Sequence, residues 1–326
     1  MLGSETGKDP AISLRNSFIL SLLCVASCTG VPMSERSTHS HRFELVVLGI
    51  AQDGGLPHLG CQKVCCVEAR KNRRQLTPAA LGIIDHVTGH SVLIEATPAI
   101  ESQLALFRSV TETDEIPRHP IDAVLITHAH IGHYTGLIHF GREVASTQAI
   151  PLHVSERMAS FLTHNGPWSQ LVQLDQVHPT VFIPGTPFSP IDGISVTAFA
   201  VPHRDEFSDT VAFRIDGPNR TVLFCPDIDR FRGTLLEELI EGVDVAYLDA
   251  TFYDGRELPG RDLSEIPHPP MVVTMERLGV LARETPGRFR FIHLNHTNPA
   301  LREKEIQREV EKRGFRIAEE GERIGL

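Results

Sequence analysis

Three histidines lie close together in the stretch "THAHIGH", at His128, His130 and His133. They follow "IDAVLI", a short apolar segment that predicts a buried strand. A turn directly after a strand can aim several side chains at one point, and neutral imidazole is a ligand that suits zinc, iron or manganese. We therefore interpret the cluster as part of a metal site. Histidines on a solvated loop are the alternative.

The elements that would position this cluster alternate along the chain from residue 43. "FELVVLGI" predicts a strand, "LGIIDH" and "SVLIEA" flank a hairpin turn, and "PAIESQLALFRSV" predicts a helix with a proline near its start. Further strands are expected at 194–201, 210–216, 220–225, 243–249 and 289–293, and helices at 155–163, 234–241, 272–284 and 301–313. The residues suited to chemistry recur just past strand ends, where ligand sites of α/β proteins commonly form. One α/β domain of two sheets with outer helices fits this pattern.

Length and composition describe an ordinary globular protein. The chain has 326 residues, of which 41% are hydrophobic and 22% charged. Its formal net charge of -10 disfavours a nucleic-acid partner, because such partners are attracted by basic surfaces. We expect a small-molecule substrate, and the sequence does not indicate an oligomeric state.

The N-terminal segment has a different character. "LRNSFILSLLCVASCTG" joins a short apolar run to small residues ending at Cys28, which is typical of an export signal. "VASC" also resembles a bacterial lipobox, in which the cysteine is lipidated. We predict a lipoprotein signal peptide at residues 1–27, a tether at 28–42 and the folded domain at 43–326. The implied location is the cell envelope, with a lipid anchor at Cys28 facing the periplasm. A disordered leader is the alternative.

"THAHIGHYTGL" resembles the His-x-His-x-Asp-His motif of the metallo-β-lactamase superfamily. That resemblance implies an αββα four-layer sandwich with a metal site at the edge of its sheets. "LGIAQDGGLPHLGC", "CVEAR", "DATFYDGRELPG" and "FIHLNHTNPAL" are similar to the branch of pyrroloquinoline quinone biosynthesis protein B. The phosphodiesterase of the carbon–phosphorus lyase pathway is a related branch, and ribonuclease Z is a more distant relative of both.

The resemblance also implies a set of metal ligands. "VPHRDEF", "CPDIDRF" and "FIHLNH" place His203, Asp227 and His293 at the later motif positions. One metal would then be held by His128, His130 and His203, and a second by His133, Asp227 and His293. Zinc is the expected ion, with iron or manganese as alternatives.

Gly132 stands where the family motif has an aspartate that binds the second metal. Two divalent ions would then face Asp227 as the only proposed anionic ligand, which neutralises them poorly. We therefore expect a firmly held metal at the three-histidine position and a weak or absent second one. Asp53, Asp205 and Asp229 are substitutes among which spacing does not discriminate.

Asp249 and His268 resemble an acid–histidine pair that protonates the leaving group in ribonuclease Z-like enzymes. A carboxylate orients an imidazole and raises its pKa, so that it can act as a general acid near neutrality. The alternative is an aspartate that caps a strand and a histidine on the surface.

A cysteine-rich stretch, "GCQKVCCVEAR", contains Cys61, Cys65 and Cys66. In the phosphodiesterase branch, similar cysteines bind a structural zinc with the second histidine of a His-x-x-His motif, which is His296 here. The resemblance therefore implies a structural zinc, and a disulfide is the alternative. Cys225, in an apolar segment, is expected to be a core thiol.

Three functions follow from these residues. The first is a metal-dependent hydrolase of a small ester-like substrate, with resemblance favouring a phosphodiester, in which a metal activates water. The second is a metal-dependent oxygenase of the biosynthesis B type. The third is a non-catalytic binding or carrier protein whose glycine at position 132 marks a decayed site.

Overall fold

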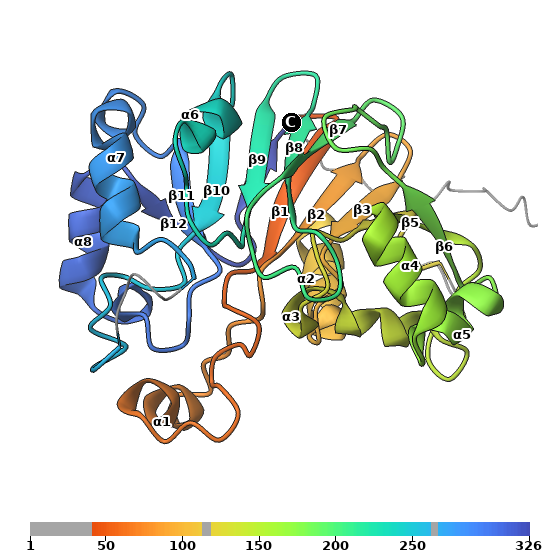
Figure 1. Ribbon diagram of the computed structural model, residues 1–326, viewed down its shortest axis with the longest axis horizontal. Coiled ribbons are helices and arrows are strands. Elements are labelled where there is room, and N and C mark those ends of the chain that lie inside the picture. Colours follow the sequence, from red (N-terminus) through yellow and green to blue (C-terminus); the bar gives the residue numbers. More distant parts are fainter. Residues whose placement is uncertain (1–40, 113–118, 262–266) are drawn as a thin grey trace, which may run out of the picture. The chain divides into compact units, whose positions relative to one another are not determined.

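The fold consists of two β-sheets packed face to face with helices on their outer sides (Figure 1). The computed structural model describes residues 41–112, 119–261 and 267–326. The predicted signal peptide, Cys28 and the tether up to residue 40 lie outside the described residues. The predicted α/β class and αββα four-layer arrangement are confirmed.

The first sheet has seven strands and the second has six. In spatial order the first sheet contains β13 (Arg323–Gly325), β1 (Phe43–Gly49), β2 (Ala80–Asp85), β3 (Ser91–Ile94), β4 (Ala123–Leu125), β5 (Ile150–Val154) and β6 (Val177–Val181). The second contains β12 (Arg316–Ile317), β11 (Phe289–Ile292), β10 (Val245–Asp249), β9 (Thr221–Cys225), β8 (Val211–Asp216) and β7 (Ser195–Ala200). The predicted hairpin is formed by β2 and β3, which pair antiparallel.

Helices alternate with the strands of both sheets along the chain. They are α1 (Val64–Lys71), α2 (Ile100–Thr111), α3 (Ile131–Tyr134), α4 (Glu156–His164), α5 (Trp168–Gln173), α6 (Leu235–Ile240), α7 (Met271–Glu284) and α8 (Lys304–Lys312), with 3-10 turns at Thr135–Phe140 and Pro299–Leu301. No helix of the described ranges is long and apolar enough to cross a lipid bilayer.

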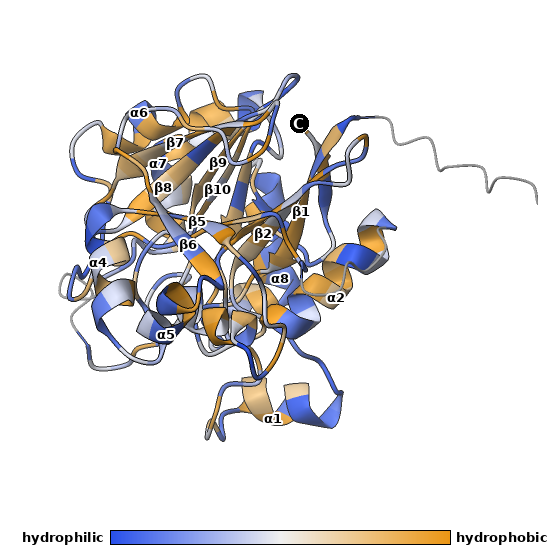
Figure 2. Ribbon diagram, turned by 90° about the vertical axis from the view of Figure 1, so that its right-hand side faces the viewer, coloured by the Kyte–Doolittle hydropathy of each residue, from blue (hydrophilic) through white to orange (hydrophobic). Residues whose placement is uncertain are grey.

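Strand β1 shows how alternation builds the layers. Phe43, Leu45 and Val47 point into the core cluster that contains residues of both sheets, whereas Val46 and Leu48 belong to the cluster beneath α2 and α4. Successive side chains of a strand face opposite sides, so a strand covered on both faces is apolar throughout. In Figure 2 the strands are accordingly coloured mostly as hydrophobic, while hydrophilic colour appears on the outer helices.

The directions of the strands bring the candidate ligand residues to one edge of the sandwich. β1, β3 and β4 run the same way, because β2 is antiparallel to both β1 and β3 and β4 is parallel to β3. β7, β9, β10 and β11 also share one direction in the second sheet. The loops after these strands carry all the candidate ligands of the histidine cluster.

The pattern did not predict the helices α1, α3 and α5 or the strands β5, β6, β12 and β13. β6 (VHPTV) and β5 (IPLHV) each contain a proline, which lowers strand propensity, and β6 occupies the sheet edge where proline is tolerated. The N-terminus of α1 has no side-chain hydrogen bond from its N-cap residue. These short elements exist because tertiary packing stabilises them.

Replacing Phe213 with alanine should lower the free energy of unfolding by about 3 to 5 kcal/mol, because its ring is fully buried in the core shared by both sheets. Phe207→Ala is the matched control, since Phe207 is 59% exposed, and should change stability by no more than about 0.5 kcal/mol. Urea denaturation followed by circular dichroism measures both. Equal losses would contradict the core position of Phe213.

Candidate metal centre

Loops from both sheets bring five histidines and one aspartate together. His128 and His130 follow β4, and His133 lies in α3. The second sheet supplies its members from the loops that follow three strands: His203 after β7, Asp227 after β9 and His293 after β11. All six ligand residues implied by the resemblance are thus near neighbours in two groups.

The first group contains His128, His130, His203 and Asp227. His130 Nδ1 lies 2.9 Å from His128 Nε2 and 3.1 Å from His203 Nε2. Asp227 Oδ2 lies 3.3 Å from His128 Nε2 and 3.2 Å from His203 Nε2. Ligands about 2.0–2.1 Å from a tetrahedral zinc are separated by about 3.3 Å, so this spacing matches a zinc-sized cation.

The second group lies close to the same oxygen of Asp227. Asp227 Oδ2 lies 3.8 Å from His133 Nε2 and 3.9 Å from His293 Nε2. Asp53, from the loop after β1, completes this group, with its Oδ1 3.2 Å from His133 Nε2. Asp227 Oδ2 therefore belongs to the first group and lies close to both imidazoles of the second.

Each imidazole turns one nitrogen inward and holds the other against an oxygen. The outer contacts are His128 Nδ1 to Thr127 Oγ1 at 2.9 Å, His130 Nε2 to Glu206 at 3.0 Å, His133 Nδ1 to Glu95 at 3.2 Å, His203 Nδ1 to Asp229 at 2.8 Å and His293 Nδ1 to Thr251 Oγ1 at 3.0 Å. Such outer contacts set the tautomer and orientation of metal-binding histidines.

These outer contacts also bear on the inner nitrogens, which face one another and the Asp227 carboxylate. When both rings are neutral and Glu206 and Asp229 accept their outer protons, the inner nitrogens of His130 and His203 carry lone pairs only. These lone pairs lie 3.1 Å apart and face the carboxylate of Asp227. A cation among them removes the repulsion, so the donor set fits a bound metal.

The pKa shifts in the buried centre also favour a bound cation. Burial alone would raise the pKa of Asp227, but the imidazoles of His268 and His293 hold it well below its usual range, so the carboxylate stays ionised. Burial alone would lower the pKa of His133, yet the neighbouring Glu95 and Asp53 carboxylates raise it well above its usual value. The centre therefore attracts positive charge.

Asp249 and His268 form the predicted pair. Asp249 Oδ2 lies 2.8 Å from His268 Nδ1, and the same nitrogen lies 3.2 Å from Asp227 Oδ1. Asp249 is fully buried and also accepts hydrogen bonds from the backbone N–H groups of Ile228 and Thr251. His268 thus touches the oxygen of Asp227 that faces away from the two ligand groups.

The cysteines form a separate group with His296. The Sγ atoms of Cys61, Cys65 and Cys66 and one nitrogen of His296 all lie within 4.8 Å of one another, and the three thiols are free. The backbone N–H groups of His58 and Lys63 donate to Cys66 and Cys61. Burial lowers the pKa of His296 to about 4, which leaves a neutral ring available as a ligand. Three sulfurs and one nitrogen are a donor set typical of structural zinc.

Cys225 is a buried core thiol in β9, as predicted.

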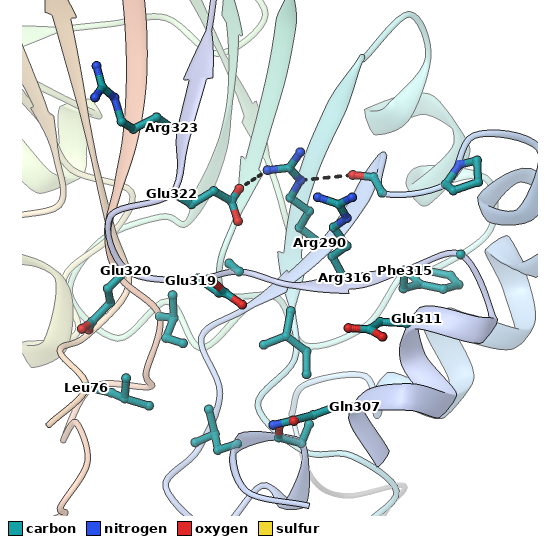
Figure 3. Close-up of a pocket in the computed structure, with 18 of the residues that line it drawn as sticks. Leu76, Arg290, Gln307, Glu311, Phe315, Arg316, Glu319, Glu320, Glu322 and Arg323 are labelled. Carbon is teal, nitrogen blue, oxygen red and sulfur yellow. Dashed lines mark hydrogen bonds and ion pairs between the residues drawn. The ribbon is translucent and has the colours of Figure 1, made fainter. Parts of the chain in front are cut away.

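A pocket of about 970 Å³ opens beside β11, β12 and α8 (Figure 3). In it Arg290 pairs with Glu322, which also accepts a hydrogen bond from the Tyr247 hydroxyl at 2.7 Å. None of its lining residues belongs to the histidine cluster, the Asp249–His268 pair or the cysteine group. The residues suited to chemistry therefore lie at the histidine cluster.

Residues 90–294 match the family model described as "Beta-lactamase superfamily domain". The chain belongs to the β-lactamase superfamily. The matched range contains all five cluster histidines and Asp227, whereas Asp53 and the cysteine group, including His296, lie outside it.

Relatives within this superfamily share most of the chain. Coenzyme PQQ synthesis protein B of Methylobacterium sp. (strain 4-46) is 26% identical over 302 residues, covering 86% of this chain and 98% of that protein. The protein of the same name from Cupriavidus necator is 27% identical over 305 residues, with the same coverage.

Solved structures show the shared fold. Zn(2+)-bound PqqB from Methylobacterium extorquens superposes with a TM-score of 0.74 at 22% identity, covering 87% of this chain and all of that one. A diphosphatase from the PhnP family gives a TM-score of 0.63 at 20% identity, covering 86% and 96%.

Sequence reasoning missed the residues that support the ligands. Glu95 is fully buried at the end of β3, where it accepts hydrogen bonds from the backbone and hydroxyl of Thr127 and faces His133. The sequence signal that could have identified Glu95 was its position as an acid directly after the apolar run "SVLI". Glu95, His268 and His293 also adopt positive φ angles of 74°, 81° and 63°, a strained backbone that clusters at functional sites.

Glu95→Gln should weaken metal binding by about 10- to 100-fold, because Glu95 holds the outer nitrogen of His133 and the hydroxyl that positions His128. Competition with a chromophoric chelator measures the affinity. Glu305→Gln is the control, since its side chain is 80% exposed. Unchanged affinity in Glu95→Gln would show that Glu95 does not support the ligands.

Proposed function

We propose that this chain is a metal-dependent hydrolase of a small ester-like substrate, with a phosphodiester as the preferred class. The observation that carries the proposal is the position of Asp227 Oδ2 close to the imidazoles of two neighbouring ligand groups, with His268 and Asp249 beside them. Two-metal sites joined in this way suit the displacement of an oxygen leaving group.

The residues divide into two metal positions. His128, His130 and His203 hold one ion, and His133 and His293 hold the other, with Asp227 between them. Zinc is the proposed ion, and the nitrogen and oxygen donors also accept iron or manganese. When bound, such ions supply Lewis acidity and a water nucleophile at neutral pH.

His268 supplies the proton for the departing oxygen. Asp249 fixes the ring through its Nδ1 at 2.8 Å, which leaves Nε2 as the atom that exchanges a proton with substrate. Because both carboxylates near Nδ1 are buried, the ring is held firmly in this orientation.

The chain loaded with zinc or manganese should hydrolyse bis(p-nitrophenyl) phosphate. His268→Asn should lower kcat by about 10²- to 10⁴-fold while leaving metal content unchanged, because His268 moves a proton and binds no ion. Release of p-nitrophenolate and elemental analysis measure the two effects. Loss of an ion in His268→Asn would make this residue a ligand. Absence of turnover on phosphodiesters, lactones and carboxylic esters would overturn the hydrolase.

A metal-dependent oxygenase is the second candidate. His133, His293 and Asp53 present two imidazoles and one carboxylate, the donor set of many non-haem iron oxygenases. The similarity to proteins named for coenzyme PQQ synthesis supports the same alternative. Oxygen consumption by the iron-loaded chain with a tyrosine-containing substrate would favour it, whereas tight ligand retention without turnover would favour a carrier.

We also propose that the cysteine group holds a structural zinc. His296→Ala should remove one ion and lower the melting temperature, because the fourth ligand is lost, whereas His128→Ala should remove a different ion. His178→Ala is the control, since its side chain is 70% exposed. Elemental analysis of the four proteins decides. If His296→Ala retains the metal content of the parent protein, the cysteine group is not a zinc site.

A further inference from the structure

The glycine at position 132 leaves the second metal position without the aspartate of the superfamily motif. His133 and His293 are still present there, and both side chains are buried. We propose that Asp53, from the loop after β1, is the carboxylate ligand of the second metal position in place of an acid at position 132. This inference rests on the proposed function, because it assumes that the histidine cluster holds metal.

The Asp53 carboxylate lies where a ligand is needed. Its Oδ1 is 3.2 Å from His133 Nε2 and 3.4 Å from His293 Nε2, and both nitrogens are the ones turned toward Asp227. These separations equal those expected between ligands of one tetrahedral ion. Asp53, His133 and His293 therefore provide three donors, and Asp227 Oδ2 lies 3.8 and 3.9 Å from the two imidazoles.

Asp53 also occupies the space that a side chain at position 132 would need. A Cβ atom built on Gly132 would lie 2.2 Å from Asp53 Oδ1 and 2.5 Å from Asp53 Cα. Gly132 belongs to the helical turn α3, so its backbone conformation does not require glycine. Glycine is required at this position because Asp53 approaches it so closely. The chain can hold the Asp53 loop or a side chain at position 132, but not both.

The loop that carries Asp53 is tied to the strand end that carries His293. Ala51 forms a β-bridge with Leu294, and the backbone N–H of Gln52 donates to the carbonyl of Leu294 at 2.9 Å. Gly55, with φ of 65°, closes the turn by donating to the carbonyl of Gln52. The backbone thus positions Asp53 directly beside His293.

The other two acids that the sequence left open have different contacts. Asp229 Oδ1 accepts the outer Nδ1–H of His203 at 2.8 Å, so it supports a ligand of the first position. Asp205 Oδ1 accepts a hydrogen bond from the Thr210 hydroxyl at 3.0 Å and belongs to none of the ligand groups of the described residues. Asp53 is the one of the three that faces the second position.

A second carboxylate also corrects the charge balance. With Asp227 alone, two divalent ions would meet a single anionic ligand; with Asp53 they meet two, and buried Glu95 stands behind His133. Anionic ligands lower the electrostatic cost of bringing two cations together in a buried site. The second position is thus equipped to hold its ion firmly.

Metal titration of the full chain tests the proposal, with Asp53→Asn, Asp53→Ala, Gly132→Ala, His128→Ala and Asp205→Asn as variants. Zn²⁺ and Co²⁺ are the probes, stoichiometry is read by elemental analysis, and Co²⁺ absorption reports ligand geometry. Asp53→Asn keeps the size of the side chain and thereby guards against misfolding, which thermal melts monitor.

Asp53→Asn and Asp53→Ala should each lose one ion, or bind it at least about 100-fold more weakly, since even groups that only support ligands are worth about 10- to 100-fold. Gly132→Ala should show the same loss, because its Cβ would displace Asp53. The ion lost in His128→Ala should remain in the Asp53 variants, and Asp205→Asn should behave as the parent protein.

Two different failures can be told apart. If His128→Ala and both Asp53 variants all retain the parent stoichiometry and affinity, the histidine cluster holds no metal and the proposed function falls with the inference. If His128→Ala loses an ion but both Asp53 variants bind as the parent protein does, Asp53 is not a ligand and the hydrolase proposal stands without it.

Discussion

The constraint on which this structure depends is a buried carboxylate surrounded by imidazole nitrogens. Asp227 is 2% exposed and turns Oδ2 toward the inner nitrogens of five histidines. Unpaired acceptors and charges are costly inside a protein, where the dielectric constant is low. The loops of both sheets nevertheless hold this arrangement, and strained backbone at Glu95, His268 and His293 is part of it. A cation is the species that makes such an arrangement favourable.

The outer contacts explain how the arrangement persists. An oxygen contacts the outer nitrogen of every cluster imidazole, and three of those oxygens belong to acids: Glu206, which is exposed, Glu95 and Asp229. The acids add negative charge behind the ligands, so that the cluster and its surroundings act as one electrostatic unit. Asp249 extends the same unit to His268.

The glycine at position 132 takes a different meaning once space is considered. In the sequence motif, glycine at this position removes an aspartate ligand and suggests that the metal site has decayed. In the fold, it is the residue that admits the Asp53 loop, whose backbone approaches α3 more closely than any Cβ would allow. The turn after β1, which carries Asp53, and the turn after β4, which carries Gly132, meet because both strand ends reach the same edge of the sandwich.

The sequence by itself determined the two-sheet fold, most strands and helices, the histidine cluster, the Asp249–His268 pair and the cysteine group. The strands, the helices and the histidine cluster follow from local signals such as alternation and spacing, whereas the Asp249–His268 pair and the cysteine group came from the family resemblance. It did not determine β5, β6, β12, β13, α1, α3 or α5, whose short or proline-containing segments depend on their neighbours. Only the tertiary structure places Asp53, rather than Asp205 or Asp229, beside His133 and His293, and only it reveals Glu95. The reason is physical, since Asp53 and His293 are 240 residues apart and only sheet packing decides which distant loops meet.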